Sequence, residues 1–213
     1  MEANYWHQKW QRGDIAFHRD EANLHLVAHL AQLELTEGDR VFLPLCGKTR
    51  DIAYLLSCSY QVLGVELSEL AICELFEDLS IAPQVSLVEG FDGFHRYQAD
   101  GITIFVGDFF KLSAELTGEI AAIYDRAALV ALPRTMRNDY AKHLIKLSHN
   151  ARQLLVTYEY QQELIDGPPF SISEQEVREH YGETYKISMV DRAEVEGGLK
   201  GKVPSSESVY LLR

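Results

Sequence analysis

The residues Val41-Phe42-Leu43-Pro44-Leu45 form a short apolar run, and Cys46-Gly47-Lys48-Thr49 follow it directly. Such a run, bounded by turn residues, is typical of a strand buried on both faces. Cys46-Gly47-Lys48 turns the chain, and Thr49 can cap a helix whose core face is Ile52, Leu55 and Leu56. A buried strand, a glycine turn and an amphipathic helix, in this order, predict the first unit of an α/β sheet.

The same alternation repeats along the chain. Further strands are predicted at residues 61–66, 102–106, 120–124, 153–158, 185–190 and 208–212, and a hairpin at 94–101. Helices are predicted after the capping residue Ser68, over Met136–Leu147, and from Ser173-Glu174-Gln175-Glu176 toward Tyr181. The last two strands have no helix between them, which implies an antiparallel edge. We therefore expect an α/β fold: a doubly wound, mainly parallel, seven-stranded sheet with helices on both faces.

The first 35 residues have a helical pattern and are predicted to form an N-terminal cover. Leu24, Val27, Ala28 and Ala31 fall at helical spacing, so we expect them to form the buried stripe of this segment. Residues 36–213 would then supply the sheet and its helices. Without an internal repeat or a Pro/Ser-rich linker, the chain of 213 residues is predicted to be a single domain, 1–213.

Composition excludes several classes of protein. Hydrophobic residues make up 46% of the chain and charged residues 24%, a globular balance. No apolar run is long enough to cross a bilayer, and the start lacks the pattern of a signal peptide. The formal net charge of -12 disfavours nucleic acid as a partner. Cys46, Cys58 and Cys73 contain no CxxC pair, which favours reduced thiols, a cytoplasmic protein and no structural metal.

Polar residues follow four predicted strands in succession. In an open α/β sheet, ligands bind beyond the carboxyl ends of the strands, where strand order reverses. The residues expected at this edge are Leu45, Cys46 and Gly47 after the first strand, Glu66 at the end of the second, Asp108 and Phe109 after the third, and Asp125 and Arg126 after the fourth.

Glu66 is the most informative of these residues. A carboxylate at the end of the second strand can accept hydrogen bonds from both hydroxyls of a ribose, although a surface glutamate is the alternative. Gly47 would let a ligand approach the backbone, or is an ordinary turn glycine. Asp108 can accept from an adenine amino group, with Phe109 against the ring, or simply begins a helix. Together they predict a nucleoside site without naming the cofactor.

Other residues at this edge have structural alternatives. Asp125 can pair with Arg126 or hold a loop together. Lys48 is interpreted as a solvated lysine, because Gly47-Lys48-Thr49 lacks the earlier glycine of a phosphate-binding loop. Cys46 is interpreted as a small buried residue.

Two histidines have the spacing of metal ligands. His25 and His29 are four residues apart, but no acid is expected beside them and no HExxH motif occurs, so a solvated helix face is predicted and no metal. Ser/His/Asp catalysis has no support either, because no G-x-S-x-G sequence is present.

Six motifs in order point to one family. They are Trp6-His7-Gln8-Lys9-Trp10, Ala16-Phe17-His18, Phe42-Leu43-Pro44-Leu45-Cys46-Gly47-Lys48, Gly64-Val65-Glu66-Leu67-Ser68, Tyr124-Asp125-Arg126-Ala127-Ala128-Leu129-Val130-Ala131 and Gly167-Pro168-Pro169-Phe170. With the terminal Val209-Tyr210-Leu211-Leu212, the chain resembles the bacterial branch of the thiopurine S-methyltransferase family. The resemblance implies a class I methyltransferase fold, S-adenosyl-L-methionine as cofactor and a small-molecule acceptor. We also expect a monomer with no membrane association.

The resemblance also assigns roles to residues. It implies that Trp6, Trp10, Leu45, Gly47, Glu66, Leu67, Asp108, Phe109 and Arg126 bind the cofactor, and that Phe17 and Arg126 contact the acceptor. Residues 191–202 do not align with the basic acceptor-side loop of animal members. No general base is identified. His18, Asp14 and Glu159 are candidates for organising water.

The implied reaction is methyl transfer to a soft nucleophile: an aromatic or heterocyclic thiol, or a selenium or tellurium species. Three other classes stay open. An NAD-dependent oxidoreductase shares the acid after the second strand but has a glycine fingerprint that is missing here. A nucleic-acid amino-methyltransferase has an Asn/Asp-Pro-Pro-aromatic sequence where this chain has Asp125-Arg126-Ala127-Ala128. A binding module could keep the fold without catalysis.

Overall fold

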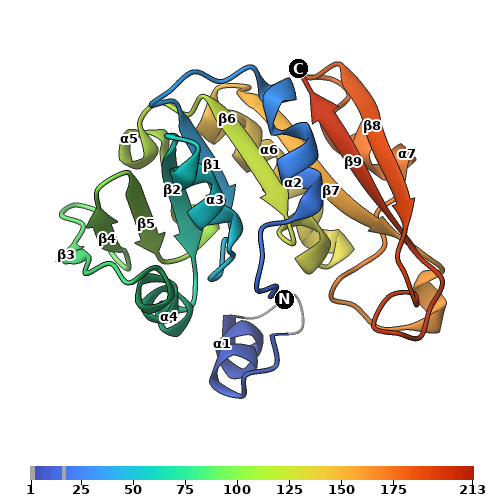
Figure 1. The fold of residues 1–213 in the computed structure, drawn as a ribbon, viewed down its shortest axis with the longest axis horizontal. Coiled ribbons are helices and arrows are strands. Elements are labelled where there is room, and N and C mark those ends of the chain that lie inside the picture. Colours follow the sequence, from blue (N-terminus) through green and yellow to red (C-terminus); the bar gives the residue numbers. More distant parts are fainter. Residues whose placement is uncertain (1–2, 16–17) are drawn as a thin grey trace.

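A computed structural model describes residues 3–15 and 18–213, and its described strands form one nine-stranded sheet (Figure 1). The strands are β1 (Arg40–Pro44), β2 (Gln61–Glu66), β3 (Gln84–Leu87), β4 (His95–Ala99), β5 (Ile102–Val106), β6 (Ala122–Arg126), β7 (Arg152–Glu159), β8 (Ile187–Glu194) and β9 (Ser206–Leu212). Their order across the sheet is β3-β4-β5-β2-β1-β6-β7-β9-β8.

The centre of the sheet is parallel and both of its edges are antiparallel. β5, β2, β1, β6 and β7 run parallel, while β9 pairs antiparallel with β7 and with β8, as the absence of a connecting helix predicted. The predicted number of seven strands was wrong, because β3 and β4 extend the other edge. All residues of β3 are exposed, so this strand has no buried face to produce an apolar pattern in the sequence.

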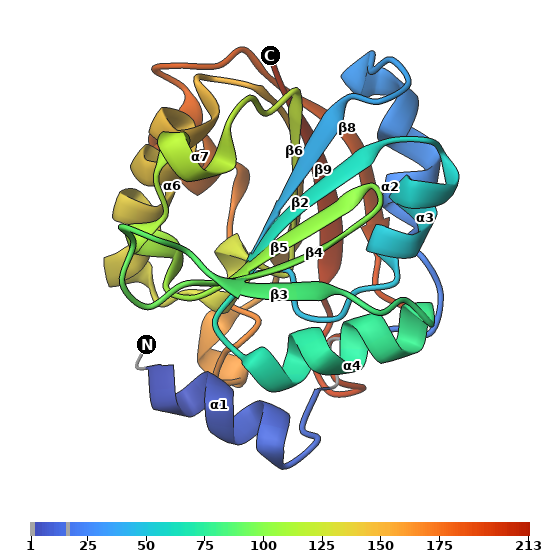
Figure 2. The ribbon, with the colours of Figure 1, turned by 90° about the vertical axis from the view of Figure 1, so that its left-hand side faces the viewer.

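Helices cover both faces of the sheet (Figure 2). The α-helices are α1 (Ala3–Gln11), α2 (Leu24–His29), α3 (Asp51–Ser57), α4 (Glu69–Leu79), α5 (Ala114–Thr117), α6 (Arg134–Ser148) and α7 (Glu174–Tyr181). The 3-10 helices are η1 (Leu30–Leu33), η2 (Phe109–Lys111), η3 (Leu129–Ala131) and η4 (Gln162–Leu164). α2, α3 and α4 pack on one face, and α6 and α7 on the other. Among the described residues, no helix has both the length and the apolar character needed to span a bilayer.

Two predicted helix caps are confirmed. The Ser68 side chain accepts a hydrogen bond from the amide of Ala71 at the start of α4, and Ser173 accepts one from the amide of Glu176 at the start of α7. Each cap satisfies a helix N–H group that has no partner within the helix. The Ser68 cap also fixes where the chain leaves β2, at the carboxyl end of the sheet.

The predicted buried stripe of the N-terminal segment was wrong. Leu24 is 74% exposed and Val27 is 46% exposed, whereas Leu26, Leu30 and Leu33 are buried against the sheet. Both sets of residues have helical spacing, so periodicity alone does not choose between them. The buried set consists entirely of leucines, and burying it removes more apolar surface from water.

One close contact positions the turn after β1. A methyl group on Gly64 of β2 would lie 2.9 Å from Cys46 Sγ and 2.6 Å from Ile104 Cδ1. Gly64 therefore lets the residue after β1 and a side chain of β5 pack directly on β2. This packing helps fix the strand ends on both sides of β2.

We predict that Gly64→Ala lowers the free energy of unfolding by about 1–3 kcal/mol, because the added methyl group overpacks a buried site. Ile104→Val removes the nearest methyl group. The double variant should therefore lose less stability than the sum of the two single variants, as measured by urea unfolding of all four proteins. Strict additivity would show that the contact at Gly64 is not the cause of the loss.

Candidate functional site

The carboxyl ends of the parallel strands lie along one edge of the sheet, and α1 lies beyond that edge. Strand order reverses between β1 and β6, the position at which open α/β sheets bind ligands. Figures 1 and 2 both show α1 beyond these strand ends, and it lies beside α4. The sequence-predicted residues after β1, β2, β5 and β6 therefore lie along one edge of the sheet.

Glu66 joins two turns at this edge. Its Oε2 accepts a hydrogen bond of 2.9 Å from the Gly47 amide in the turn after β1. Its Oε1 accepts two hydrogen bonds of 2.9 Å, from the amides of Leu67 and Ser68 after β2. The residue is only 6% exposed. The carboxylate is thus held in a fixed orientation by backbone donors of two neighbouring crossovers.

Burial of Glu66 raises its pKa, and the three amide donors from Ser68, Gly47 and Leu67 oppose that rise. A carboxylate has about four lone-pair positions. Three of them are used, and the remaining one is on Oε2. Glu66 can therefore still accept from a ligand hydroxyl without giving up its backbone contacts.

The turn after β1 is shaped by two left-handed residues. Leu45 has φ 48° and Gly47 has φ 52°, so the backbone reverses direction sharply there. The buried indole of Trp10 lies on this turn, and a methyl group on Gly47 would be 3.0 Å from its Cζ2 atom. Trp6 is half-buried, with its ring edge-on to Tyr5 at 5.3 Å between centroids. The tryptophan motif thus brings α1 onto the glycine turn.

A groove of about 570 Å³ opens at Leu67 and Ser68, the two residues that follow Glu66. Its lining residues come from α1, from the start of α4 and from the turns around β5: His7, Gln11, Leu67, Ser68, Glu69, Leu70, Gly93, His95, Val106, Gly107 and Asp108. A larger hollow of about 690 Å³ is lined by residues near the amino ends of β1, β2 and β5. Because ligands of such sheets bind at the carboxyl ends, we assign the candidate site to the smaller groove.

Asp108 and Phe109 differ in what they offer to this groove. Asp108 lines it and also caps η2 by accepting a hydrogen bond of 3.0 Å from the Phe110 amide. Phe109 is buried in the core, with its ring 4.9 Å from that of Tyr140 and 5.0 Å from that of His143, measured between centroids. Asp108 can therefore both cap η2 and face a ligand in the groove. The Phe109 ring packs against helix α6 and does not line the groove.

Asp125 holds the loop after β6. It is fully buried and accepts hydrogen bonds from the Leu129 amide at 3.1 Å and from the Tyr140 hydroxyl at 2.7 Å. Burial raises the pKa of Asp125 to about 6, although these donors oppose the rise. The neighbouring Arg126 is half-buried, and none of the ion pairs within residues 3–15 and 18–213 involves it. Arg126 therefore has a guanidinium that can serve a ligand.

Lys48 forms ion pairs with α4, and Cys46 is buried. Lys48 Nζ lies 2.8 Å from Glu74 Oε2 and 3.6 Å from Asp78 Oδ2, so the interpretation of a solvated lysine was wrong. The two acids lie on α4, and their proximity to Lys48 depends on how α4 packs, which the local sequence does not predict. Cys46 is buried as predicted, and burial raises its thiol pKa well above the ordinary value.

Two of the three candidates for organising water form ion pairs with other residues. Asp14 pairs with Lys9, and Glu159 Oε2 lies 3.1 Å from Arg192. Burial lowers the pKa of His18, which favours the neutral imidazole. Phe17, the predicted acceptor contact, lies outside the described residues.

The motif Gly167-Pro168-Pro169-Phe170 and the β8–β9 loop contact each other near α1. The segment Gly167-Pro168-Pro169-Phe170 is held by the Tyr160 hydroxyl, which donates to the Pro169 carbonyl at 2.7 Å, and by Lys200, which donates to the Pro168 carbonyl at 2.9 Å. Burial and the charge of Lys9 on α1 lower the pKa of Lys200. The β8–β9 loop thus approaches both the proline loop and the N-terminal cover.

The predicted solvated face at His25 and His29, with no acid beside them, was wrong. Both side chains are 13% exposed and both point to Asp191 of β8. Sequence separation hid this acid, which is 166 residues from His25.

Comparison with known proteins gives a consistent result. Residues 1–212 match the model of a protein family described as Thiopurine S-methyltransferase. A protein of that name from Teredinibacter turnerae is 50% identical over 212 residues, covering 100% of this chain and 97% of that protein. Another from Xanthobacter autotrophicus is 48% identical over 214 residues, covering 100% and 99%.

Solved structures of low sequence identity share the fold. A 1,6-didemethyltoxoflavin-N1-methyltransferase from Burkholderia thailandensis, solved with S-adenosylhomocysteine, has a TM-score of 0.65 at 16% identity, covering 99% of this chain and 86% of that one. The magnesium protoporphyrin IX methyltransferase from Synechocystis with bound SAH has a TM-score of 0.66 at 16% identity, covering 99% and 97%.

We predict that Asp125 makes stability fall as pH rises. With a folded pKa of about 6 and an unfolded value near 4, the folded state keeps the Asp125 proton to higher pH. The stability of the wild type relative to Asp125→Asn should therefore decrease between pH 4 and pH 6 and then level off, by on the order of 2 kcal/mol. Urea unfolding across this range measures it. A relative stability that rises with pH would contradict the elevated pKa.

Proposed function

The chain belongs to the thiopurine S-methyltransferase family, and we propose that it transfers a methyl group to an aromatic or heterocyclic thiol. It is an S-adenosylmethionine-dependent methyltransferase of class I fold, whose acceptor is a small molecule. The observation that carries the assignment of the site is Glu66, a buried carboxylate at the end of β2 with one acceptor position left beside an open groove.

The residues around Glu66 fit the nucleoside end of the cofactor. Glu66 can accept from a ribose hydroxyl through its remaining Oε2 position, while Leu67 and Asp108 line the adjoining groove. Asp108 has one oxygen bonded to the Phe110 amide and can direct the other to an adenine amino group. Phe109 would support this wall from the core, because its ring packs on Tyr140 and His143.

The turn after β1 fits the methionine end. The left-handed conformations of Leu45 and Gly47 allow a ligand to approach the backbone closely. Trp10 covers this turn, and Trp6 extends the aromatic surface of α1. We infer that α1 closes over the bound cofactor and excludes water during transfer.

S-adenosylmethionine, when bound, supplies an electrophilic methyl group on a sulfonium centre. A lone pair of the acceptor sulfur forms the new sulfur–carbon bond as the bond from that methyl group to the sulfonium breaks. S-adenosylhomocysteine and the methyl thioether are the products, and a thiolate acceptor gives up no proton in the step. The enzyme's contribution is then to align the two reactants and to keep water out.

Arg126 supports an anionic acceptor. It ends β6 at the reversal of strand order, and its charge can balance a thiolate or a selenolate. The nearby loops add aromatic and aliphatic surface from Phe170 and the two prolines, and Arg137 lies 5.3 Å from the Phe170 ring centroid. The net charge of -12 disfavours nucleic acid as acceptor.

Two further proposals concern the state of the enzyme. We place it in the cytoplasm, which is supported by its three free cysteines, Cys46, Cys58 and Cys73. We also propose that it acts as a monomer.

We predict that Glu66→Gln weakens binding of S-adenosylhomocysteine about tenfold or more. The amide keeps the side-chain size but loses the charge and one acceptor, so ribose hydroxyls and backbone amides compete for what remains. Calorimetric titration measures the affinity. Glu174→Gln on α7 makes the same chemical change at an exposed ion pair with Arg178 and should leave binding unchanged. Equal affinity of the Glu66→Gln protein and the wild type would remove Glu66 from the site.

We predict that heteroaromatic thiols and selenols are methylated while matched alcohols and amines are not. Among residues 3–15 and 18–213 we identify no general base that could deprotonate an alcohol, whereas these acceptors ionise near neutral pH. The rate with labelled S-adenosylmethionine should rise with pH through the acceptor's own pKa and then level off. Arg126→Lys should reduce the rate, because lysine lacks the planar donor pair. Comparable turnover of a thiol and its oxygen analogue would reveal a base and contradict the proposal.

A further inference from the structure

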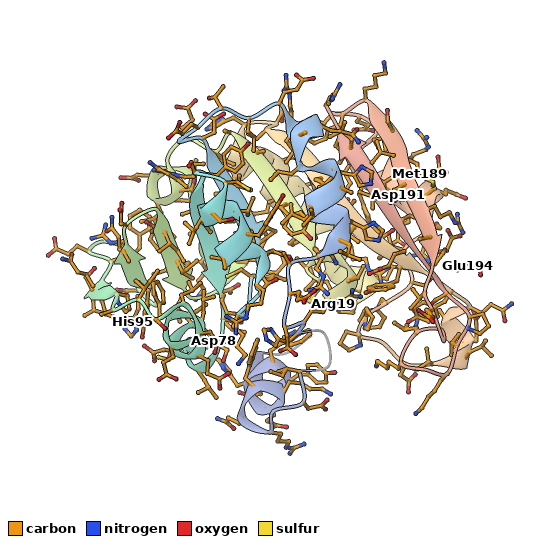
Figure 3. The ribbon with its side chains drawn as sticks, viewed as in Figure 1. Arg19, Asp78, His95, Met189, Asp191 and Glu194 are labelled. Carbon is orange, nitrogen blue, oxygen red and sulfur yellow. The ribbon has the colours of Figure 1, made fainter. Side chains whose placement is uncertain are left out.

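Two histidines of α2 and an aspartate of β8 converge on one point away from the groove. His25 Nδ1 lies 3.2 Å from Asp191 Oδ2, and His29 Nε2 lies 3.1 Å from the same oxygen. The three ligand atoms all lie within 4.8 Å of one another. Asp191 is 39% exposed, so the cluster has one side open to solvent. Figure 3 shows Asp191 on the outer part of the β8–β9 edge, beside α2.

The backbone brings this cluster about in two ways. His25 and His29 are four residues apart at the two ends of one helical turn, which places both imidazoles on the same face of α2. On β8, the register shifts between Met189, which pairs with Tyr210, and Asp191, which pairs with Val209. The extra residue there, Val190, is a β-bulge. It turns Asp191 to the face that carries α2, because without it Asp191 would pair with Ser208 and face the opposite layer.

His25 has more acceptors around it than a neutral imidazole can satisfy. Its Nδ1 faces Asp191, and its Nε2 lies 3.4 Å from Oε2 of the nearly buried Glu207. A neutral imidazole has one N–H group, so a lone pair of the other ring nitrogen would face a carboxylate lone pair. Either a second proton or a cation between Nδ1 and Asp191 removes that repulsion. With Nε2–H donated to Glu207, the Nδ1 lone pair is oriented toward Asp191.

The other ring nitrogen of His29 is also held. The Gln32 side-chain amide lies 2.9 Å from His29 Nδ1. A half-turn of this amide lets its oxygen accept the Nδ1–H bond, which leaves the Nε2 lone pair facing Asp191. Metal-binding histidines are oriented in this manner, by a carboxylate or an amide at the nitrogen that does not bind the metal.

We propose that His25, His29 and Asp191 bind a divalent transition-metal ion, with Zn²⁺ as the preferred occupant. A tetrahedral zinc ion holds nitrogen and oxygen ligands at about 2.0–2.2 Å, which places two such ligand atoms roughly 3.3 Å apart. The two separations from Asp191 Oδ2, 3.2 Å and 3.1 Å, are close to this value, and the two histidine nitrogens lie within 4.8 Å of each other. Water would take the fourth position on the open side. Two imidazoles and one carboxylate select zinc and its neighbours over Ca²⁺ or Mg²⁺, which prefer oxygen ligands.

The ion would connect the N-terminal segment to the edge of the sheet. α2 follows α1 in the N-terminal segment, and β8 and β9 form the last hairpin of the chain. Arg19, just before α2, lies 3.8 Å from Glu207 on β9 (Figure 3), so charged contacts join these parts even without an ion. Metal binding would strengthen this connection and raise the melting temperature without entering the methyl-transfer chemistry.

The test is metal titration of the full chain after removal of metals with a chelator. Co²⁺, which gives visible absorption bands in tetrahedral sites, should bind with one equivalent and be displaced by Zn²⁺. Zn²⁺ should also raise the melting temperature of the wild type. His29→Gln and Asp191→Asn should each weaken binding tenfold or more and abolish the zinc-dependent shift. His180→Gln is the matched control, because His180 is 11% exposed and lies 3.4 Å from Glu176 without a third ligand group.

Several outcomes would overturn the proposal. They are the absence of a one-equivalent Co²⁺ site in the wild type, binding by Asp191→Asn that equals wild-type binding, and a cobalt spectrum with an intense sulfur-to-metal band, which would place the ion on a cysteine. Asp191 is partly exposed, so we expect the Asp191→Asn protein to fold. If the His29→Gln protein does not fold, the Asp191→Asn protein decides the question. If wild type and variants differ only in the pH dependence of melting, the histidines bind protons and not metal.

Discussion

The arrangement of the site depends on a single carboxylate placed where water is largely excluded. Taking Glu66 out of water is unfavourable unless donors replace the lost hydration, and three backbone amides do so. Because these amides belong to the turns after β1 and β2, the carboxylate fixes the distance between two crossovers. Trp10 of α1 packs on the Gly47 turn, which Glu66 holds in position. The position of the N-terminal helix therefore also depends on this acid.

Strand-end charges in this protein are accommodated in different ways. Glu66 lies at the groove and is bonded by main-chain donors only, which leaves it available to a ligand. Asp125, at the end of β6, faces inward and is bonded by Leu129 and Tyr140, so it fastens a loop. Acidic residues in similar positions of the sequence thus perform binding and structural roles, and the direction of the side chain decides between them.

The sequence predicted the parts of the fold that follow from local patterns. β2 and β5 have the predicted bounds, and the caps at Ser68 and Ser173 are present, because buried strands and capping residues act over a few neighbours. It also predicted that Glu66 and Asp108 would lie at one edge. The exposed strand β3 was missed because it has no buried face, and the buried stripe of α2 was misplaced because two sets of apolar residues have the same spacing.

Contacts between distant segments were beyond such reasoning. The ion pair of Lys48 with Glu74, the burial of Phe109 against α6 and the convergence of His25 on Asp191 all depend on how whole elements pack.

The bulge at Val190 has a consequence for the evolution of this chain. The residues before the bulge contribute to the layer beneath α6 and α7, and Asp191 after it faces α2. Substitutions of the exposed residues Ser188 and Glu194 should be tolerated, whereas insertion or deletion of one residue between Met189 and Asp191 would exchange the two layers for every residue beyond it. The length of β8 is therefore a stricter structural requirement than the identity of its exposed residues.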